Sequence, residues 1–114
     1  MQRTANLLAD IPAPSETEKF TDILNLPGIR IERIVSTGQA DPMGQWQCQG
    51  WDEWVLLVEG RATVEMRDAN ASTRQLPLER GDYLLISTGT PHRVASTDPD
   101  HPTIWLAVHI GETR

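Results

Sequence analysis

Two polar side chains that could do chemistry occur in otherwise apolar runs. Glu53 shares one strand face with Val55 and Leu57, because successive side chains of a strand point to opposite faces. By the same rule, His92 shares its face with Val94. A carboxylate in such apolar surroundings needs a partner. We therefore expect Glu53 and His92 to face one cavity and to lie near each other.

This pair allows two interpretations. Glu53 and His92 could form an ion pair or a hydrogen bond, either with each other or, for Glu53, with an arginine. Alternatively, they could be two ligands of a divalent metal, since Zn, Fe, Mn and Ni all accept imidazole and carboxylate. A metal with open coordination positions could act as a Lewis acid or as an oxygen-activating centre. The residues alone leave both interpretations open.

His109 is a further candidate for the pocket, near the end of the chain. It shares a face with Trp105 and Ala107, whereas the other face of this run is uniformly apolar. If the face of His109 lines the pocket, His92, His109 and Glu53 could form a set of two histidines and one carboxylate. If the apolar face lines the core, His109 points away. Alternation does not decide between the two.

Two more residues are candidates for the pocket. Cys48 would bind Zn strongly as a thiolate, but a lone cysteine more often packs as a small buried apolar side chain. Trp51 is expected at a turn, partly exposed, where it could flank the mouth of the pocket. His101 lies between Asp100 and Pro102, and we expect it in an exposed loop.

The elements that must position these residues are short strands. The chain has 114 residues, which predicts one domain, and its eight prolines and eight glycines predict frequent turns. Strands are predicted over 29–36, 45–49, 53–59, 61–67, 75–78, 83–87, 92–96 and 103–110. Such a series is typical of an all-β sandwich or barrel. We divide the chain into residues 1–28 and a barrel over 29–114.

A short helix is predicted before the strands, near residues 16–25. Ser15 and Glu18 have the spacing of a capping box, and three apolar residues follow at helical spacing, namely Phe20, Ile23 and Leu24. Leu26-Pro27-Gly28 would end this helix. We expect it to pack one apolar stripe on the barrel.

Charge and cysteine content exclude several classes of function. The net charge of −6 argues against binding nucleic acid or an anionic membrane, since both need clustered cationic side chains. Cys48 is the only cysteine, so no internal disulfide can form, which suits a reducing cytoplasm. The first ten residues lack the apolar run of a signal peptide, and no run approaches membrane-spanning length.

The spacing of several residues resembles the cupin superfamily. The first cupin motif ends in Glu, six residues and Gly, which here matches Glu53 and Gly60. The second runs Gly, five residues, Pro-x-Gly, two residues, His, three residues and Asn, and its positions here are Gly81, Ser87, Gly89, His92 and Ser96. The chain also resembles a subgroup of small bacterial cupins in the segments from Ile31 to Gly38 and from Trp105 to His109.

The resemblance implies a fold and a ligand set. It implies the cupin double-stranded β-helix, a jelly-roll-like barrel, with metal ligands at Glu53, His92 and the positions that cupins fill with two histidines. Three-residue spacing before Glu53 puts Gln47 and Gln49 in those two positions, and four-residue spacing puts Trp46 and Cys48 there. An amide oxygen is a weak, neutral ligand, so either glutamine would lower metal affinity relative to histidine.

Two functions from different classes follow from this resemblance. One is a metal-dependent enzyme on a small polar metabolite, of the isomerase or dioxygenase kind, with Zn, Fe, Mn or Ni. The other is a binding or sensing module without metal. We also expect a homodimer, because strands such as 54–58 and 103–110 are apolar on both faces and one small barrel has one interior.

Overall fold

The computed structural model describes residues 4–112, which form an all-β fold of two antiparallel sheets. No residue in this range is helical. The described strands are β1 (Lys19–Leu26), β2 (Ile29–Ser36), β3 (Asp52–Glu59), β4 (Arg61–Arg67), β5 (Thr73–Glu79), β6 (Tyr83–Ile86), β7 (His92–Thr97) and β8 (Thr103–Ile110).

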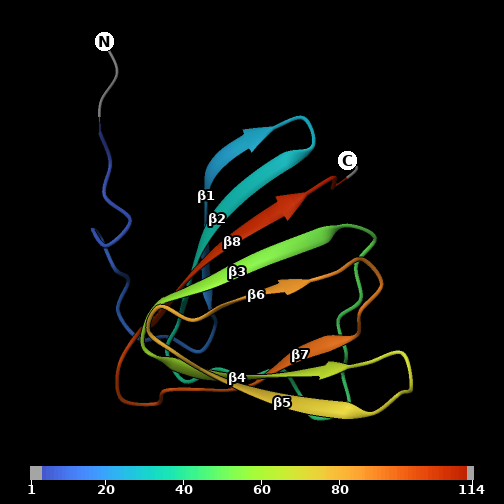
Figure 1. The fold of residues 1–114 in the computed structure, drawn as a ribbon. Helices are drawn as coiled ribbons and strands as arrows, with labels where there is room; N and C mark the ends of the chain where they lie inside the picture. Colours follow the sequence, from blue (N-terminus) through green and yellow to red (C-terminus); the bar gives the residue numbers. More distant parts are fainter. Residues whose placement is uncertain (1–3, 113–114) are drawn as a thin grey trace.

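The larger sheet has five strands in the order β1-β2-β8-β3-β6, and the smaller has three in the order β5-β4-β7. Figure 1 shows the two sheets facing each other, with the chain crossing from one to the other between β3 and β4. β8 is the central strand of the larger sheet and pairs with both β2 and β3. The interior therefore lies between β2, β8 and β3 on one side and β4 and β7 on the other.

The predicted helix near 16–25 is wrong: residues 19–26 form β1, which pairs antiparallel with β2. The helical spacing of Phe20, Ile23 and Leu24 coincides with a break in strand register between Asp22 and Leu24, so it does not report a helix face. Hairpin pairing satisfies the backbone of these residues, and this tertiary contact overrides the weak local helix signal. Gly28, with φ of 78°, supplies the turn into β2.

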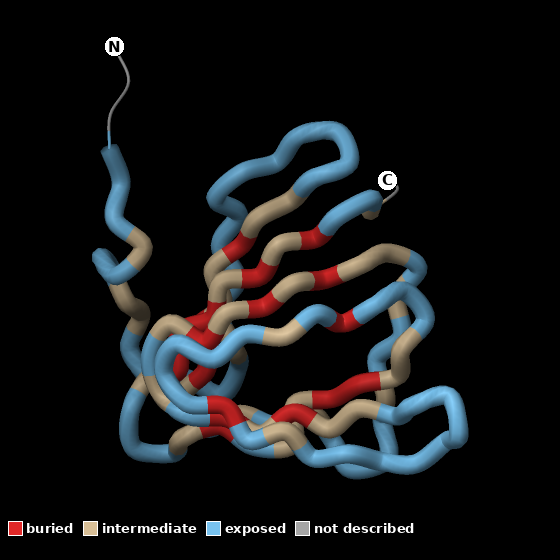
Figure 2. The backbone as a smooth tube through the Cα atoms, viewed as in Figure 1, coloured by how far each residue is buried: buried red, intermediate tan, exposed pale blue. Residues whose placement is uncertain are grey.

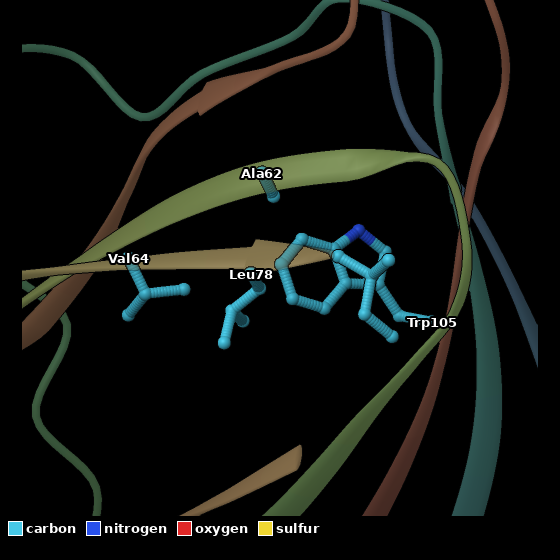
Figure 3. Packing of buried hydrophobic residues seen from close by; sticks show 5 residues of the cluster. Ala62, Val64, Leu78 and Trp105 are labelled. Atoms are coloured by element: carbon cyan, nitrogen blue, oxygen red, sulfur yellow. The ribbon is translucent and has the colours of Figure 1, made fainter. Parts of the chain in front are cut away.

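Burial alternates along the strands as the period of two requires. On β3 the buried positions are Glu53, Val55 and Leu57, and Figure 2 shows the same alternation of buried positions on the neighbouring strands of the larger sheet. One cluster of buried residues joins the sheets at one end of the interior, drawn in Figure 3, and consists of Leu57, Ala62, Val64, Leu78 and Trp105.

Gly60 turns the chain from β3 into β4, and this turn permits no other residue without a shift. Its φ is 95°, which L side chains rarely adopt. A Cβ here would lie 2.5 Å from Thr103 Oγ1 and 2.7 Å from Thr103 Cα. The close approach seats the β7–β8 connection against the turn and thereby fixes where β8 enters the larger sheet.

Candidate functional site

The barrel interior holds a cavity of about 200 Å³ between the two sheets. One part of its wall is apolar and the other is polar and charged. The polar and charged lining residues are Glu18, Arg30, Glu32, Gln47, Gln49, Glu53, His92 and His109. A larger and more open hollow of about 700 Å³ lies on the surface beside Gly60 and His101, and none of the predicted site residues lines it. The interior cavity is therefore the candidate site.

The structure brings most of the predicted residues to this cavity. The lining includes the four residues proposed as metal ligands, which are Glu53, His92, Gln49 and Gln47. It also includes His109 on β8, the residue whose direction the sequence did not decide. The face of Trp105, Ala107 and His109 is thus the inward face of β8. Cys48 is exposed and Trp51 is half-buried, and neither lines the cavity.

Glu53 is positioned by the start of strand β3, of which it is the second residue, and by the loop before it. Its side chain is buried, with 9 % of the residue exposed. Gln49 donates a hydrogen bond from Nε2 to Glu53 Oε1 at 2.8 Å. Gln49 therefore serves the carboxylate as a donor in this structure. Among residues 4–112, no hydrogen bond or ion pair occupies the second oxygen, Oε2.

His92 opens β7 and is 5 % exposed. Its backbone forms an isolated bridge with Gln47, which holds the 45–49 segment against the strand. Its Nδ1 lies 2.9 Å from the carbonyl oxygen of Thr90. A carbonyl can only accept, so Nδ1 carries a proton, and in the neutral imidazole Nε2 then carries a lone pair. Within the described chain this Nε2 has no hydrogen-bond partner, so it is free to accept from a ligand in the cavity.

His109 has both ring nitrogens engaged and is 3 % exposed. The indole Nε1 of Trp51 donates to His109 Nδ1 at 2.8 Å, and an indole N–H can only donate. Nδ1 is therefore unprotonated, and the proton on Nε2 is donated to Glu32 Oε1 at 2.9 Å. His109 is therefore neutral, with its proton on Nε2, whereas the proton that the hydrogen bond places on His92 is on Nδ1.

The network continues from Glu32 to Arg30. Arg30 Nη1 donates to Glu32 Oε2 at 2.8 Å, and Arg30 Nε donates to Glu112 Oε2 at 2.8 Å. Asp22 lies 3.6 Å from Arg30 Nη1. Burial alone would raise the pKa of Glu32, but the hydrogen bond from His109 and the charge of Arg30 outweigh it and hold that pKa below its ordinary value. Glu32 is therefore an ionised carboxylate inside the barrel.

The other acidic residue of the lining is Glu18, just before β1. It accepts a hydrogen bond from Ser36 Oγ, which in turn accepts one from Trp105 Nε1 at 3.1 Å. Burial raises the pKa of Glu18, the hydrogen bond from Ser36 opposes that rise, and the charge of Asp41 adds to it. Glu18 and Glu32 are thus shifted in opposite directions by their surroundings.

The donor set does not fit a tightly held divalent metal. His92 Nε2 and the Glu53 carboxylate are two strong donors, but Gln47 and Gln49 offer only neutral amide oxygens. Gln47 is exposed and its amide nitrogen donates to Asp41 at 2.8 Å. His109 could coordinate only by giving up a hydrogen bond. Over residues 4–112, no group of three His, Cys, Asp or Glu side chains is placed to hold a metal ion.

Arg93 follows His92 in β7, and its side chain lies on the opposite face of the strand. The structure buries it, with an ion pair to Glu65 at 3.0 Å and a hydrogen bond to the Asp41 carbonyl at 3.1 Å. The segment before β3 covers this face, which alternation within β7 does not reveal.

Sequence reasoning missed Arg30, Glu32 and Glu18 as site residues. In β2 the polar Arg30 and Glu32 alternate with Ile29 and Ile31, which predicts that the isoleucines face the interior. The structure reverses this, and Arg30 and Glu32 line the cavity. The pairing of β2 with β8 is the signal that would have identified Arg30, because it makes Arg30 the cross-strand neighbour of His109.

Comparisons with known proteins agree with this architecture. Residues 35–109 match the family model described as a cupin domain. A candidate mannose-6-phosphate isomerase from Ralstonia eutropha is 40 % identical, with 97 % of this chain and 100 % of that chain covered and a TM-score of 0.87.

Two more distant structures share the fold. A cupin superfamily protein from Desulfitobacterium hafniense is 16 % identical, with coverage of 98 % and 94 % and a TM-score of 0.76. A protein from Thermus thermophilus is 17 % identical, with coverage of 98 % and 100 % and a TM-score of 0.78. No curated protein matches the chain. With its two-sheet barrel, its interior cavity and a family match over most of its length, the chain belongs to the cupin family.

Proposed function

We propose that this cupin binds a small polar metabolite in the barrel cavity and holds it without a resident metal. The observation that carries the proposal is that two nearly buried residues of the cavity lining each have an atom without a hydrogen-bond partner among residues 4–112, His92 Nε2 and Glu53 Oε2. Both atoms keep some solvent access, since the fully buried side-chain atoms without a partner within residues 4–112 are Arg33 Nε and Arg93 Nε. A bound molecule would supply the missing partners, and the apolar wall would pack against its carbon skeleton.

The test is a binding screen with small polar metabolites, monitored by protein NMR. We expect a bound compound to shift resonances of Val55, Val64 and Ile86, which line the cavity. His92→Ala should weaken that binding at least about tenfold, and His101→Ala, a change in the exposed β7–β8 loop, should leave it unchanged. Compounds that bind only outside the cavity, or equally well to both variants, would contradict the proposal.

A second candidate is an isomerase-like reaction, favoured by the 40 % identity to a candidate mannose-6-phosphate isomerase. In such a reaction, His92 Nε2 or Glu53 would accept a proton from a carbon next to a carbonyl group. Deuterium incorporation from solvent into a bound hydroxycarbonyl compound would test it. Incorporation lost in Glu53→Gln supports catalysis, and binding without incorporation leaves the binding function alone.

The resident-metal alternative has its own test. Metal analysis of protein purified without an affinity tag should find divalent metal far below one ion per chain, because two strong donors give weak affinity. Stoichiometric metal that is lost in His92→Ala with the fold intact would replace our proposal by a metal-dependent one.

We also propose that the chain works as a homodimer in the cytoplasm. The outer face of the larger sheet carries exposed apolar side chains, including Tyr83 at 66 %, Leu85 at 53 % and Ile110 at 46 % exposure. Such a patch on a sheet face is typical of an interface. The lone, free Cys48 suits a reducing compartment. Sedimentation of a clean monomer at micromolar concentration would contradict the dimer, and Leu85→Glu should shift a dimer toward monomer.

A further inference from the structure

We propose that the ligand of this cavity carries a protonated amine, and that phosphorylated and other anionic molecules are excluded. This inference rests on the proposed function, because it names the charge of the molecule that the cavity holds. It is carried by the balance of charges and of hydrogen-bonding capacity in the lining.

The charges of the lining favour a cation. Three carboxyl groups line the cavity, those of Glu18, Glu32 and Glu53, whereas Arg30 is the one cationic side chain among the described lining residues. His109 is neutral by its two hydrogen bonds, and we infer that His92, whose Nδ1 donates to Thr90, is neutral as well. Even with Glu18 protonated, two carboxylates face one guanidinium. A positively charged ligand would reduce this excess of negative charge, and a negatively charged ligand would add to it.

Arg30 is not available to an anion, because its positive charge is already surrounded. Glu32 and Glu112 each accept a hydrogen bond from Arg30 at 2.8 Å, and Asp22 lies 3.6 Å away. A phosphate or carboxylate at Arg30 would have to displace one of these side chains or lie beside them. Guanidinium groups that bind phosphate instead present an open pair of N–H donors.

The free atoms of the site are acceptors. Within residues 4–112 no hydrogen bond engages His92 Nε2 or Glu53 Oε2, and a neutral His92 with its proton on Nδ1 presents a lone pair at Nε2. His92 is 5 % exposed and Glu53 is 9 % exposed, so both groups have given up most contact with water. An ammonium group offers three N–H donors and a positive charge, which meets both needs with charge-assisted hydrogen bonds.

The experiment compares three probes of similar size and different charge: aminopropanediol, glycerol and glycerol 3-phosphate. Each is titrated into the full chain in the presence of a chelator, and binding is followed by the imidazole resonances of His92. We expect aminopropanediol to bind at least about tenfold more tightly than glycerol. Glycerol 3-phosphate should cause no shift.

A pair of variants locates the charge that matters. Glu53→Gln should reduce the preference for aminopropanediol over glycerol to within about twofold, since it removes the carboxylate and keeps the shape. Glu59→Gln, on the same strand but exposed and outside the cavity, is the matched control and should leave the preference unchanged. Melting curves of both variants confirm that each is folded.

The outcomes separate this inference from the proposed function. Equal binding of glycerol, or stronger binding of glycerol 3-phosphate, at His92 overturns the charge assignment and leaves the cavity as a binding site. If micromolar Mn²⁺, added in place of the chelator, displaces aminopropanediol, the inference is also overturned. The cation that the cavity prefers would then be a metal ion and not an amine. No response of His92 to any probe, nor to any compound of the metabolite screen, contradicts both.

Discussion

The two ends of the barrel interior bury their side chains by different means. At one end Trp105 packs among Leu57, Val64 and Leu78, and its indole N–H donates to Ser36. At the other end His109, with nearly the same burial, lies between Trp51 and Glu32 and is held by two hydrogen bonds. The first arrangement is typical of a core. The second arrangement buries polar groups. At this end, Glu53 Oε2 has no hydrogen-bond partner within residues 4–112.

The comparison explains why one barrel can carry both stability and a binding site. Inward residues of β3 change from Glu53 through Val55 to Leu57 over four positions, a distance of roughly 13 Å along a strand. The packed apolar end closes the barrel, so the polar end can depart from ideal packing. Substitutions at the two ends should therefore differ in what they change.

The largest effect on stability is expected at the apolar end. Leu57 is fully buried, and Leu57→Ala leaves a cavity against Trp105 and Ala62. We expect a loss of about 2–5 kcal/mol in the free energy of unfolding, measured by urea denaturation. Ligand binding at His92 should survive in the fraction that remains folded. A loss of binding with little loss of stability would contradict the division between the two ends.

A smaller loss is expected when the polar network is broken. His109→Ala removes the acceptor of Trp51 and the donor to Glu32, but Glu32 keeps its hydrogen bond from Arg30. The expected loss is about 1–3 kcal/mol, the cost of leaving buried polar groups without partners. His101→Ala, an exposed loop histidine, is the control and should change stability by less than about 0.5 kcal/mol. Equal effects of the two changes would show that His109 is not part of a buried network.

The pH dependence of stability tests the charge of Glu32. Its pKa in the folded chain lies below the ordinary value of 4.5, so the unfolded chain binds the proton more readily. The stability that Glu32 contributes is therefore present above about pH 4.5 and is lost as the pH falls through its folded pKa. Glu32→Gln should lower stability at pH 7 and flatten the loss below pH 4.5. An acid profile as steep as that of the unchanged chain would contradict this.

The smallest effect is expected at Glu18, and it has the opposite sign. Because burial raises its pKa, the folded chain holds the proton more tightly, and stability falls as the pH rises through that raised pKa. Glu18→Gln should therefore increase stability at pH 7, by less than about 1 kcal/mol because the hydrogen bond from Ser36 offsets part of the burial cost. A decrease at pH 7 would show that ionised Glu18 stabilises the fold.

Alternation in the sequence predicted much of the fold and part of the site, for physical reasons. Glu53 and His92 stand out because each is polar on a strand face that is otherwise apolar. β8 is apolar on both faces, so the direction of His109 depended on its partners β2 and β3. β1 was mistaken for a helix because an edge strand with every residue exposed has little burial pattern of its own. Arg30 and Glu32 were missed because only cross-strand neighbours make an inward charge stable.

The central claim is that the polar end presents acceptors to a ligand, and the tautomers of the two histidines test it most directly. A long-range ¹H–¹⁵N spectrum of the imidazole side chains at neutral pH distinguishes them. We predict that His92 is protonated at Nδ1, facing the Thr90 carbonyl, and that His109 is protonated at Nε2, facing Glu32. A proton on His92 Nε2, or a doubly protonated His92, would remove the free lone pair and contradict the account.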